Sequence, residues 1–203
     1  RTSDGMLKWL LLAPCLALAV SWNAAAQEAP ADLATLIECR GDIAGFTALA
    51  PALESPLTAA VLGWEPLPQA NMFMSEYRLA TPIRVFGHDS DHIAFSGSSI
   101  MALLDLPDPR PLARQLDLET AIDTPAKAMF GKELHREEIR DADSGKVLIE
   151  SIVLNVSNVS SHPGKTLVGC TYSLDLPEED DGTGDEDAPP QGAAPPASGT
   201  QPG

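Results

Sequence analysis

Positive charge is scarce in this sequence. Its 203 residues include 13 Lys and Arg against 29 Asp and Glu, so the formal net charge is −16 at pH 7. A chain with this balance repels phosphate backbones and anionic membrane surfaces, which argues against nucleic acid as a partner. A cationic protein partner in the cell envelope or outside the cell fits the charge, and so does simple solubility.

Long hydrophobic runs are also missing. The longest, Trp9 to Val20, is shorter than the roughly 20 residues that cross a bilayer as a helix. It follows a lysine and precedes a run of small residues that ends at Ala26. A positive start, a short apolar stretch and a small-residue cleavage site indicate an export signal in residues 1–26, with residues 1–5 as an upstream extension. We expect no stable membrane anchor after cleavage, and a bacterial protein that is periplasmic or secreted.

Only three cysteines are present, at Cys15, Cys39 and Cys170. Cys15 lies inside the export signal, where the preceding proline disfavours lipid attachment, so it is expected to leave with the signal. The other two are most simply a disulfide in an exported chain. That bridge would close a loop of about 130 residues and stabilise the fold by roughly 4–5 kcal/mol in the loop-entropy description. The alternative, a reactive thiol at Cys39, needs a positive and exposed environment that Arg40 alone does not establish.

The C-terminal stretch lacks both bases and large apolar residues. Residues 177–203 contain seven acidic residues among many Pro, Gly and Ala. Such a composition buries too little apolar surface to offset the entropy of ordering, so we expect a disordered acidic tail. Without residues 1–26, which carry two bases and one acid, the net charge becomes −17. The tail contributes −7 of this, so the single globular domain at residues 27–176 carries about −10.

The first third of the domain has no helical pattern long enough to be stable alone. Apolar residues recur at helical spacing in three short stretches, which must therefore pack on another surface. An aspartate or serine precedes each stretch and can cap free N–H groups, and a glycine or proline follows it. The expected caps are Asp32, Asp42 and Ser55, and the residues placed to end the helices are Gly41, Pro51 and Gly63.

From residue 72 onward the dominant hydrophobic period is two, which predicts strands. The exceptions are a helix expected after Asp108 and a connection at residues 120–125. An irregular connection around Trp64 precedes this region. We predict an α+β fold: a mainly antiparallel sheet of about five or six strands, with short N-terminal helices and one mid-chain helix packed on it. The expected strand segments lie within residues 72–79, 83–86, 92–95, 99–106, 132–140, 146–156 and 166–176, of which 99–106 is ambiguous with helix.

The last three segments read as a meander with distinct positions in the sheet. The third alternates clearly, with Cys170 and Tyr172 on the same face. The second is apolar on both faces near its middle, which favours a central position. The first, Lys132 to Arg140, is highly charged, and charge on a strand discourages pairing with other sheets. We therefore expect it at an edge.

The densest group of metal-ligand side chains is His88, Asp89, Asp91 and His92. Imidazole and carboxylate together suit a transition metal such as zinc. The segment reads as a hairpin loop, however, and the four-residue spacing of the histidines brings them together only on a helix. An ordinary polar turn is the alternative, since no second group of ligands stands out elsewhere.

Other motifs are incomplete. Asp141, Asp143 and Gly145 are spaced as at the opening of a calcium loop, but the acid expected at position 12 is replaced by Ile152. The segment ending in Gly164-Lys-Thr has Val159 where a phosphate-binding loop has its first glycine. No G-x-S-x-G esterase motif is present. We therefore expect no cofactor.

These features favour a small non-catalytic binding or inhibitor-like module. Its partner would be a protein, met at an exposed strand edge. The candidate partner-binding residues are Glu133, His135, Arg136, Glu137 and Trp64.

Two alternatives remain open. An envelope hydrolase or metal-dependent enzyme would need some of His88, His92, His135 and His162 to converge with a carboxylate in one pocket. Scattered histidines would weaken that hypothesis. A structural accessory protein of the envelope is the second alternative, and the sequence does not separate it from a binding module.

Overall fold

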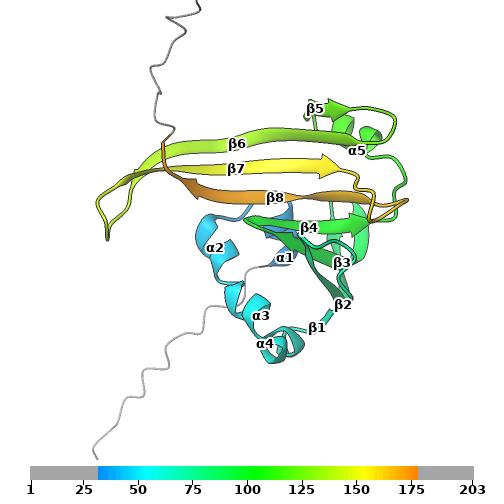
Figure 1. Cartoon of the computed structure of the whole chain (residues 1–203), viewed down its shortest axis with the longest axis horizontal. Coiled ribbons are helices and arrows are strands. Elements are labelled where there is room, and N and C mark those ends of the chain that lie inside the picture. Colours follow the sequence, from blue (N-terminus) through cyan, green and yellow to red (C-terminus); the bar gives the residue numbers. More distant parts are fainter. Residues whose placement is uncertain (1–31, 178–203) are drawn as a thin grey trace, which may run out of the picture.

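The computed structural model describes residues 32–177, so the predicted export signal, Cys15 and nearly all of the predicted acidic tail lie outside the described residues. The described part is a sheet with short helices on one side (Figure 1). The strand order is β1-β2-β3-β4-β8-β7-β6-β5, and all neighbours are antiparallel. The helices are α1 (Leu33–Ile37), α2 (Ile43–Thr47), α3 (Ala50–Glu54), α4 (Pro56–Val61) and α5 (Arg110–Gln115). The strands are β1 (Trp64–Pro66), β2 (Ser75–Val85), β3 (His88–Ser96), β4 (Ser99–Leu104), β5 (Glu119–Asp123), β6 (Ala128–Arg140), β7 (Val147–Ser157) and β8 (Thr166–Asp175).

The mainly antiparallel sheet and the short helices are confirmed, but the strand count is wrong, because the sheet has eight strands among the described residues. The two unpredicted strands, β1 and β5, lie at the two edges and occupy segments that read as connections. Strands of three and five residues are too short to show a hydrophobic period. The predicted segments 72–79 and 83–86 are instead one strand, β2, with an irregularity between Arg78 and Ile83.

The predicted helix starts are confirmed. Asp32, Asp42 and Ser55 each accept a hydrogen bond from the backbone N–H three residues later. Four N-terminal helices form instead of three, because Pro51 lies in the first turn of α3 and does not end the preceding helix. Proline is tolerated there, since the first-turn N–H groups have no partner within a helix. Gly63, at φ 77°, follows the end of α4 as predicted.

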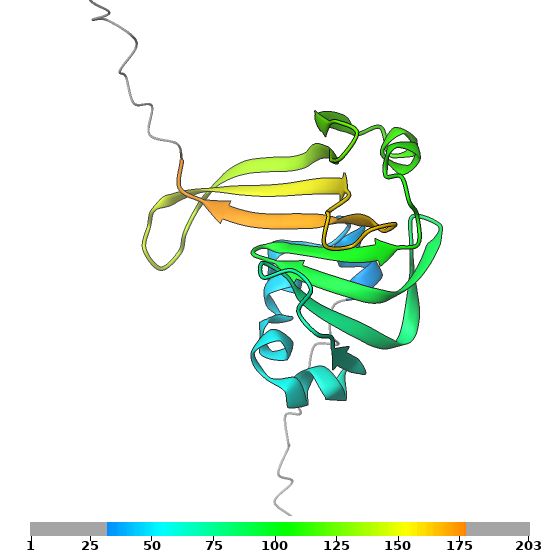
Figure 2. The ribbon, with the colours of Figure 1, turned by 45° about the vertical axis from the view of Figure 1, so that its right-hand side comes forward.

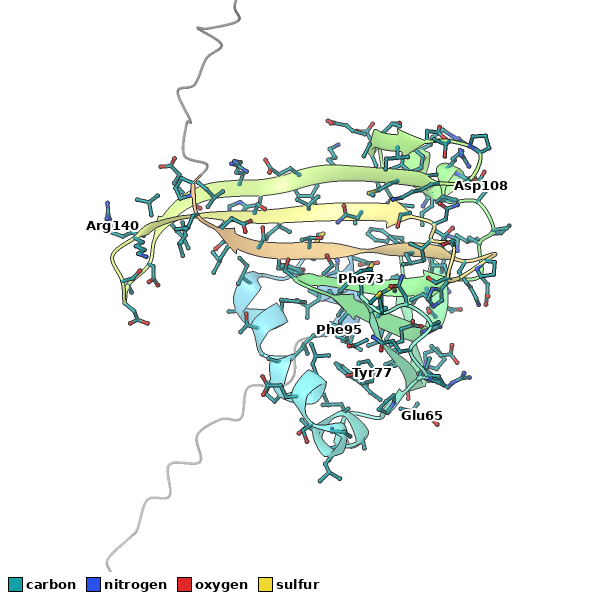
Figure 3. All side chains as sticks on the ribbon, viewed as in Figure 1. Glu65, Phe73, Tyr77, Phe95, Asp108 and Arg140 are labelled. Atoms are coloured by element: carbon teal, nitrogen blue, oxygen red, sulfur yellow. A yellow bond between two sulfur atoms is a disulfide. The ribbon has the colours of Figure 1, made fainter. Side chains whose placement is uncertain are left out.

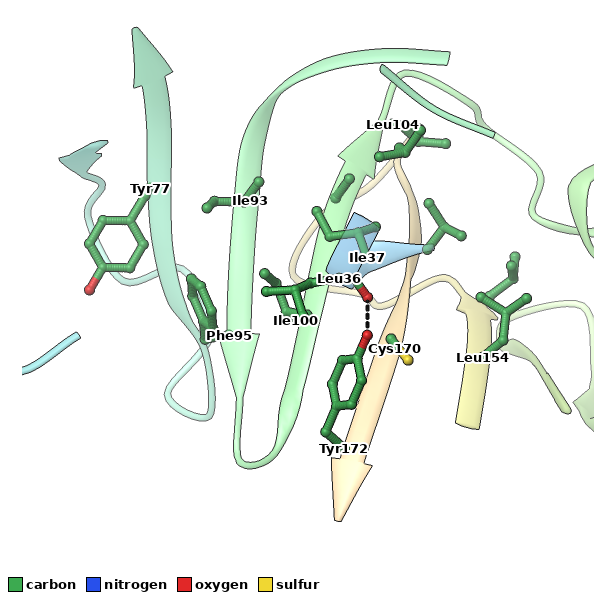
Figure 4. Packing of buried hydrophobic residues seen from close by; sticks show 14 of the residues in the cluster. Leu36, Ile37, Tyr77, Ile93, Phe95, Ile100, Leu104, Leu154, Cys170 and Tyr172 are labelled. Atoms are coloured by element: carbon green, nitrogen blue, oxygen red, sulfur yellow. Dashed lines mark hydrogen bonds between the residues drawn. The ribbon is translucent and has the colours of Figure 1, made fainter. Parts of the chain in front are cut away.

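The main core lies between these helices and one face of the sheet (Figure 4). Ile93, Ile100 and Leu104 are fully buried there, as are Leu36 and Ile37 of α1. Burying a side chain of this size contributes about 1.5–3 kcal/mol, which is how helices of five or six residues are held in place.

The predicted disulfide is present. Cys39, just after α1, is bonded to Cys170 in β8, with the two Cα atoms 5.2 Å apart and the two residues separated by 131 positions in sequence. The Tyr172 hydroxyl, two residues along β8, donates a hydrogen bond of 2.7 Å to the Leu36 carbonyl oxygen (Figure 4). Both contacts fasten α1 to the centre of the sheet.

The opposite face of the sheet carries a second, smaller core. Two loops, residues 67–74 and 158–165, lie at this face and are joined by a hydrogen bond of 3.2 Å from Asn71 Nδ2 to Ser161 Oγ. The buried side chains of this cluster are Met74, Ala94, Leu103 and Leu167. These loops and strands position the candidate site.

The β6–β7 hairpin extends well beyond the helices in both ribbon views (Figures 1 and 2). Arg140 lies near the tip of this hairpin (Figure 3). Glu65 lies far from it, on the edge strand β1. Over residues 32–177, no helix has the length and apolar character needed to cross a membrane.

Candidate functional site

The predicted metal residues His88, Asp89, Asp91 and His92 do not lie in a loop, which corrects that expectation. They belong to β3, and the turn before it consists of Phe86 and Gly87, at φ 47° and 85°. Two positive φ values match the tight turn that joins hairpin strands. In an extended strand, residues four apart are separated by roughly 13 Å, and neighbours point to opposite faces.

The four side chains therefore do not assemble into one site. Asp89 forms an ion pair of 3.0 Å with Arg84 on β2. Within the described ranges, the group of His, Cys, Asp and Glu side chains that can share a metal ion contains only His92 from the predicted set. Its other members are Glu76 and His162.

Glu76 is the centre of this group, which we call the Glu76 site. It lies on β2 opposite Ala94, so its side chain is on the same sheet face as that of His92, two residues back along β3. His162 comes from the loop between β7 and β8. Glu76 Oε2 lies 2.9 Å from Nε2 of His92 and 2.9 Å from Nε2 of His162. One ligand atom from each residue lies within 4.8 Å of the other two.

The site is deeply buried on one side and partly open on the other. The Glu76 side chain is 2% exposed, that of His162 is 9% exposed, and that of His92 is 23% exposed. Glu76 Oε1 has no hydrogen-bond partner, and it is the only such buried side-chain atom in the described part of the chain. A buried carboxylate oxygen without a partner is unfavourable, because water no longer solvates it.

A chain of polar groups fixes the orientation of the His162 ring. Its Nδ1 lies 3.0 Å from Ser161 Oγ, which in turn accepts a hydrogen bond from Asn71 Nδ2. Because Nδ1 faces Ser161, Nε2 is directed at Glu76. Contacts of this kind to the second nitrogen are what orient histidines that bind metals.

A hollow of about 360 Å³ opens beside the site. His92 is part of its wall, whereas Glu76 and His162 are not. Charges of both signs surround it: Arg78 and Lys165, together with Asp89, Asp91 and Asp105. A small ligand or water molecule in this hollow therefore meets the Glu76 site at His92.

Glu76 was not predicted, and His162 was named only as one of the four histidines that the hydrolase alternative could use. Glu76 occupies an ordinary outward position in an alternating strand, and His162 lies in a turn 86 residues away. The sequence shows only that Glu76 shares one face of an alternating segment with Met74 and Arg78. Only the contact between loop and sheet brings the two together.

The predicted partner residues lie at a free strand edge, with one exception. Strand β5 pairs with β6 only over residues 128–131, while β7 pairs along the other side of β6 as far as Arg140. Residues 132–140 of β6 therefore have one strand neighbour within the described sheet. We call this segment the β6 edge, and it carries Glu133, His135, Arg136 and Glu137.

Charged contacts along the β6 edge are loose. His135 Nε2 lies 3.7 Å from Glu137 Oε2 and 3.5 Å from Glu150 Oε1, and Arg136 Nη1 lies 3.5 Å from Glu133 Oε2. Such exposed pairs contribute little to stability, so these side chains can exchange partners.

Trp64 is the exception. It is 5% exposed, and its ring centroid lies 5.6 Å from that of Tyr77 and 5.8 Å from that of Phe95. The indole belongs to the helix-covered core and exposes little surface on which a partner could stack.

The calcium-like segment is used within its own turn. Asp141 accepts hydrogen bonds from the hydroxyl and the backbone N–H of Ser144, and these lower the pKa of its carboxyl group.

Comparison with protein-family models, curated proteins and solved structures finds no match for this chain. Function therefore has to be argued from the β6 edge and the Glu76 site.

Proposed function

We propose that this chain is an exported, non-catalytic binding module that takes an extended segment of a protein partner along the β6 edge. It would act in the periplasm or outside the cell. The observation that carries the proposal is the single-sided pairing of residues 132–140. An unpaired strand edge presents N–H and C=O groups at regular spacing, and an extended peptide can add to it as a further strand.

The charges on the β6 edge favour selective pairing. Three glutamates and two arginines lie between Glu133 and Arg140, and Glu150 of the neighbouring strand adds another acid. Charged side chains on an exposed edge strand discourage pairing with a second copy of the same edge. A partner segment with basic residues opposite the glutamates is attracted, while an acidic one is repelled.

Export is supported by the disulfide between Cys39 and Cys170. Structural disulfides persist mainly in oxidising compartments such as the periplasm and the extracellular space. Together with the export signal expected in residues 1–26, this supports a role in the envelope or beyond it.

The test is an affinity capture from the envelope fraction of the producing organism, with residues 27–203 as bait. Wild type is compared with Glu137→Lys on the β6 edge and with Glu65→Lys, the same charge change on the exposed edge strand β1. We expect a salt-sensitive partner with the wild type and with Glu65→Lys, and its loss with Glu137→Lys. Equal capture by all three proteins, or capture of no partner, would contradict the proposal.

A second candidate function is a metal-dependent hydrolase. One observation favours it: two of the four histidines, His92 and His162, meet the carboxylate of Glu76. A metal held there can acidify a bound water molecule and generate a nucleophile. Against it, only His92 borders the neighbouring hollow.

This second candidate is tested with ester, phosphoester and peptide substrates, with and without added zinc. Hydrolysis that is lost in His162→Ala and kept in His88→Ala would support it. No zinc-dependent hydrolysis by the wild type would leave the binding module as the better account.

A further inference from the structure

We infer that Glu76, His92 and His162 form a binding site for one divalent transition-metal cation of the zinc class. The inference goes beyond the proposed function, because it uses no part of the β6 edge and requires no catalysis. Two imidazole nitrogens and one carboxylate oxygen form a ligand set that zinc, cobalt(II) and similar cations accept.

The spacing of the ligand atoms is close to what a metal requires. Zinc bonds of 2.0–2.2 Å in tetrahedral geometry place ligand atoms about 3.3–3.6 Å apart. The two distances from Glu76 Oε2 to the imidazole nitrogens are each 2.9 Å, and one ligand atom from each residue lies within 4.8 Å of the other two. Side-chain shifts of roughly an ångström or less bring the three atoms to the separations that zinc requires.

The unpartnered oxygen distinguishes a metal site from a hydrogen-bonded cluster. If both imidazoles simply donate to Oε2, then Oε1 stays without a partner inside the protein. A divalent cation neutralises the buried carboxylate and lies within reach of its second oxygen, directly or through a bound water molecule. The cation thus removes an unfavourable feature that the hydrogen bonds leave in place.

The orienting groups also suit a metal. When Nε2 of His162 binds a cation, Nδ1 carries the ring proton and must donate it. Ser161 Oγ lies 3.0 Å away and can accept that hydrogen bond while also accepting the one from Asn71. The arrangement matches the usual contact of a ligating histidine with a second polar group.

The partly open side supplies the remaining coordination position. His92 faces the hollow of about 360 Å³, so a water molecule can complete the coordination from there. The side chains of the other two ligands, Glu76 and His162, are buried. A bound cation therefore links β2, β3 and the β7–β8 loop, and it stabilises the folded state by an amount that grows with the logarithm of its concentration over its dissociation constant.

The test uses residues 27–203 with the disulfide formed, freed of metal with a chelator. Zinc is titrated by calorimetry, and cobalt(II) is added separately to record its visible absorption. We expect one equivalent of zinc, a cobalt spectrum typical of tetrahedral nitrogen and oxygen coordination, and an unfolding midpoint that rises with zinc concentration. Absence of a stoichiometric site in the wild type would overturn the inference without reference to any variant.

Variants then locate the site. His162→Ala should weaken zinc binding by more than about 100-fold, and Ser161→Ala, which leaves all three ligands, by about 10-fold or more. His88→Ala is the matched control, because it removes a histidine of the same strand as His92 and should bind zinc as tightly as the wild type.

Two control variants separate the metal site from surface histidines and from the β6 edge. If His88→Ala weakens binding as much as His162→Ala, the ion is held by surface histidines and the inference is wrong. Glu137→Lys should leave zinc affinity unchanged, so failure of the partner proposal and failure of the metal site can be told apart.

Discussion

The two faces of the sheet differ in the side chains that they bury. Under the helices, the buried side chains are almost all apolar, and the buried hydroxyl of Thr166 donates to the Leu106 carbonyl oxygen. On the other face, a small apolar cluster lies beside Glu76 and His162, and one carboxylate oxygen has no partner. The helix-covered face therefore contributes most of the stability of the fold. The other face leaves the buried Glu76 Oε1 without a partner, which is unfavourable and which a bound ligand can relieve.

The largest effect should come from the disulfide that fastens the helix-covered face. Replacing Cys39 and Cys170 by alanine releases a loop of 131 residues in the unfolded chain. The free energy of unfolding should fall by about 4–5 kcal/mol, which chemical denaturation can measure. A loss below about 1 kcal/mol would show that the packing of α1 and β8 alone holds this face.

Two neighbouring leucines of β4 compare the faces directly. Leu104 is buried in the helix-covered core and Leu103 in the smaller cluster. We expect Leu104→Ala to cost about 3–4 kcal/mol and Leu103→Ala about 2 kcal/mol, because the methionines around Leu103 can move into the space. Equal costs in denaturant unfolding would remove the energetic distinction between the faces.

Glu76→Gln tests the role of the buried carboxylate whose oxygen Oε1 has no partner. The amide keeps the shape of the side chain and removes the buried charge, so without metal the unfolding free energy should stay within about 1 kcal/mol of the wild type. With zinc at 100 times its dissociation constant, the wild type should gain about 2.7 kcal/mol and the variant should gain nothing. Thermal unfolding with and without zinc measures both, and a zinc-dependent gain in Glu76→Gln would contradict the account.

The smallest effect concerns alkaline pH and the helix-covered face. Burial raises the pKa of Tyr172 to about 12. The unfolded chain ionises this group near pH 10, so its contribution to stability is complete below pH 10 and is lost as pH rises toward 12. Tyr172→Phe should lose about 1 kcal/mol at neutral pH with the hydrogen bond to Leu36, and should show a weaker decline above pH 10.

Stability measured from pH 8 to 12 checks this prediction. An equal alkaline decline in both proteins would place the titrating group elsewhere.

Much of the helix-covered face could be predicted from the sequence, because its signals are local. Asp32, Asp42 and Ser55 cap their helices as expected, and the three strands of the meander lie where the alternation indicates. The pairing of Cys39 with Cys170 followed from their being the two cysteines beyond the expected export signal.

The Glu76 site could not be predicted, because it depends on contacts between distant segments. His92 was identified, but with His88, Asp89 and Asp91 as neighbours in a loop that is in fact a strand. In a strand, closeness in sequence does not bring ligands together. His162 reaches Glu76 only when the β7–β8 loop lies at the sheet face, and that placement follows from tertiary packing.

The central claim, a cation site at Glu76, is tested most directly by crystals of the protein grown with zinc and measured at the zinc absorption edge. The account predicts one strong anomalous peak about 2.0–2.2 Å from Glu76 Oε2 and from Nε2 of both His92 and His162. A peak at His88, Asp89 or the β6 edge, or no peak at the Glu76 site, would contradict it.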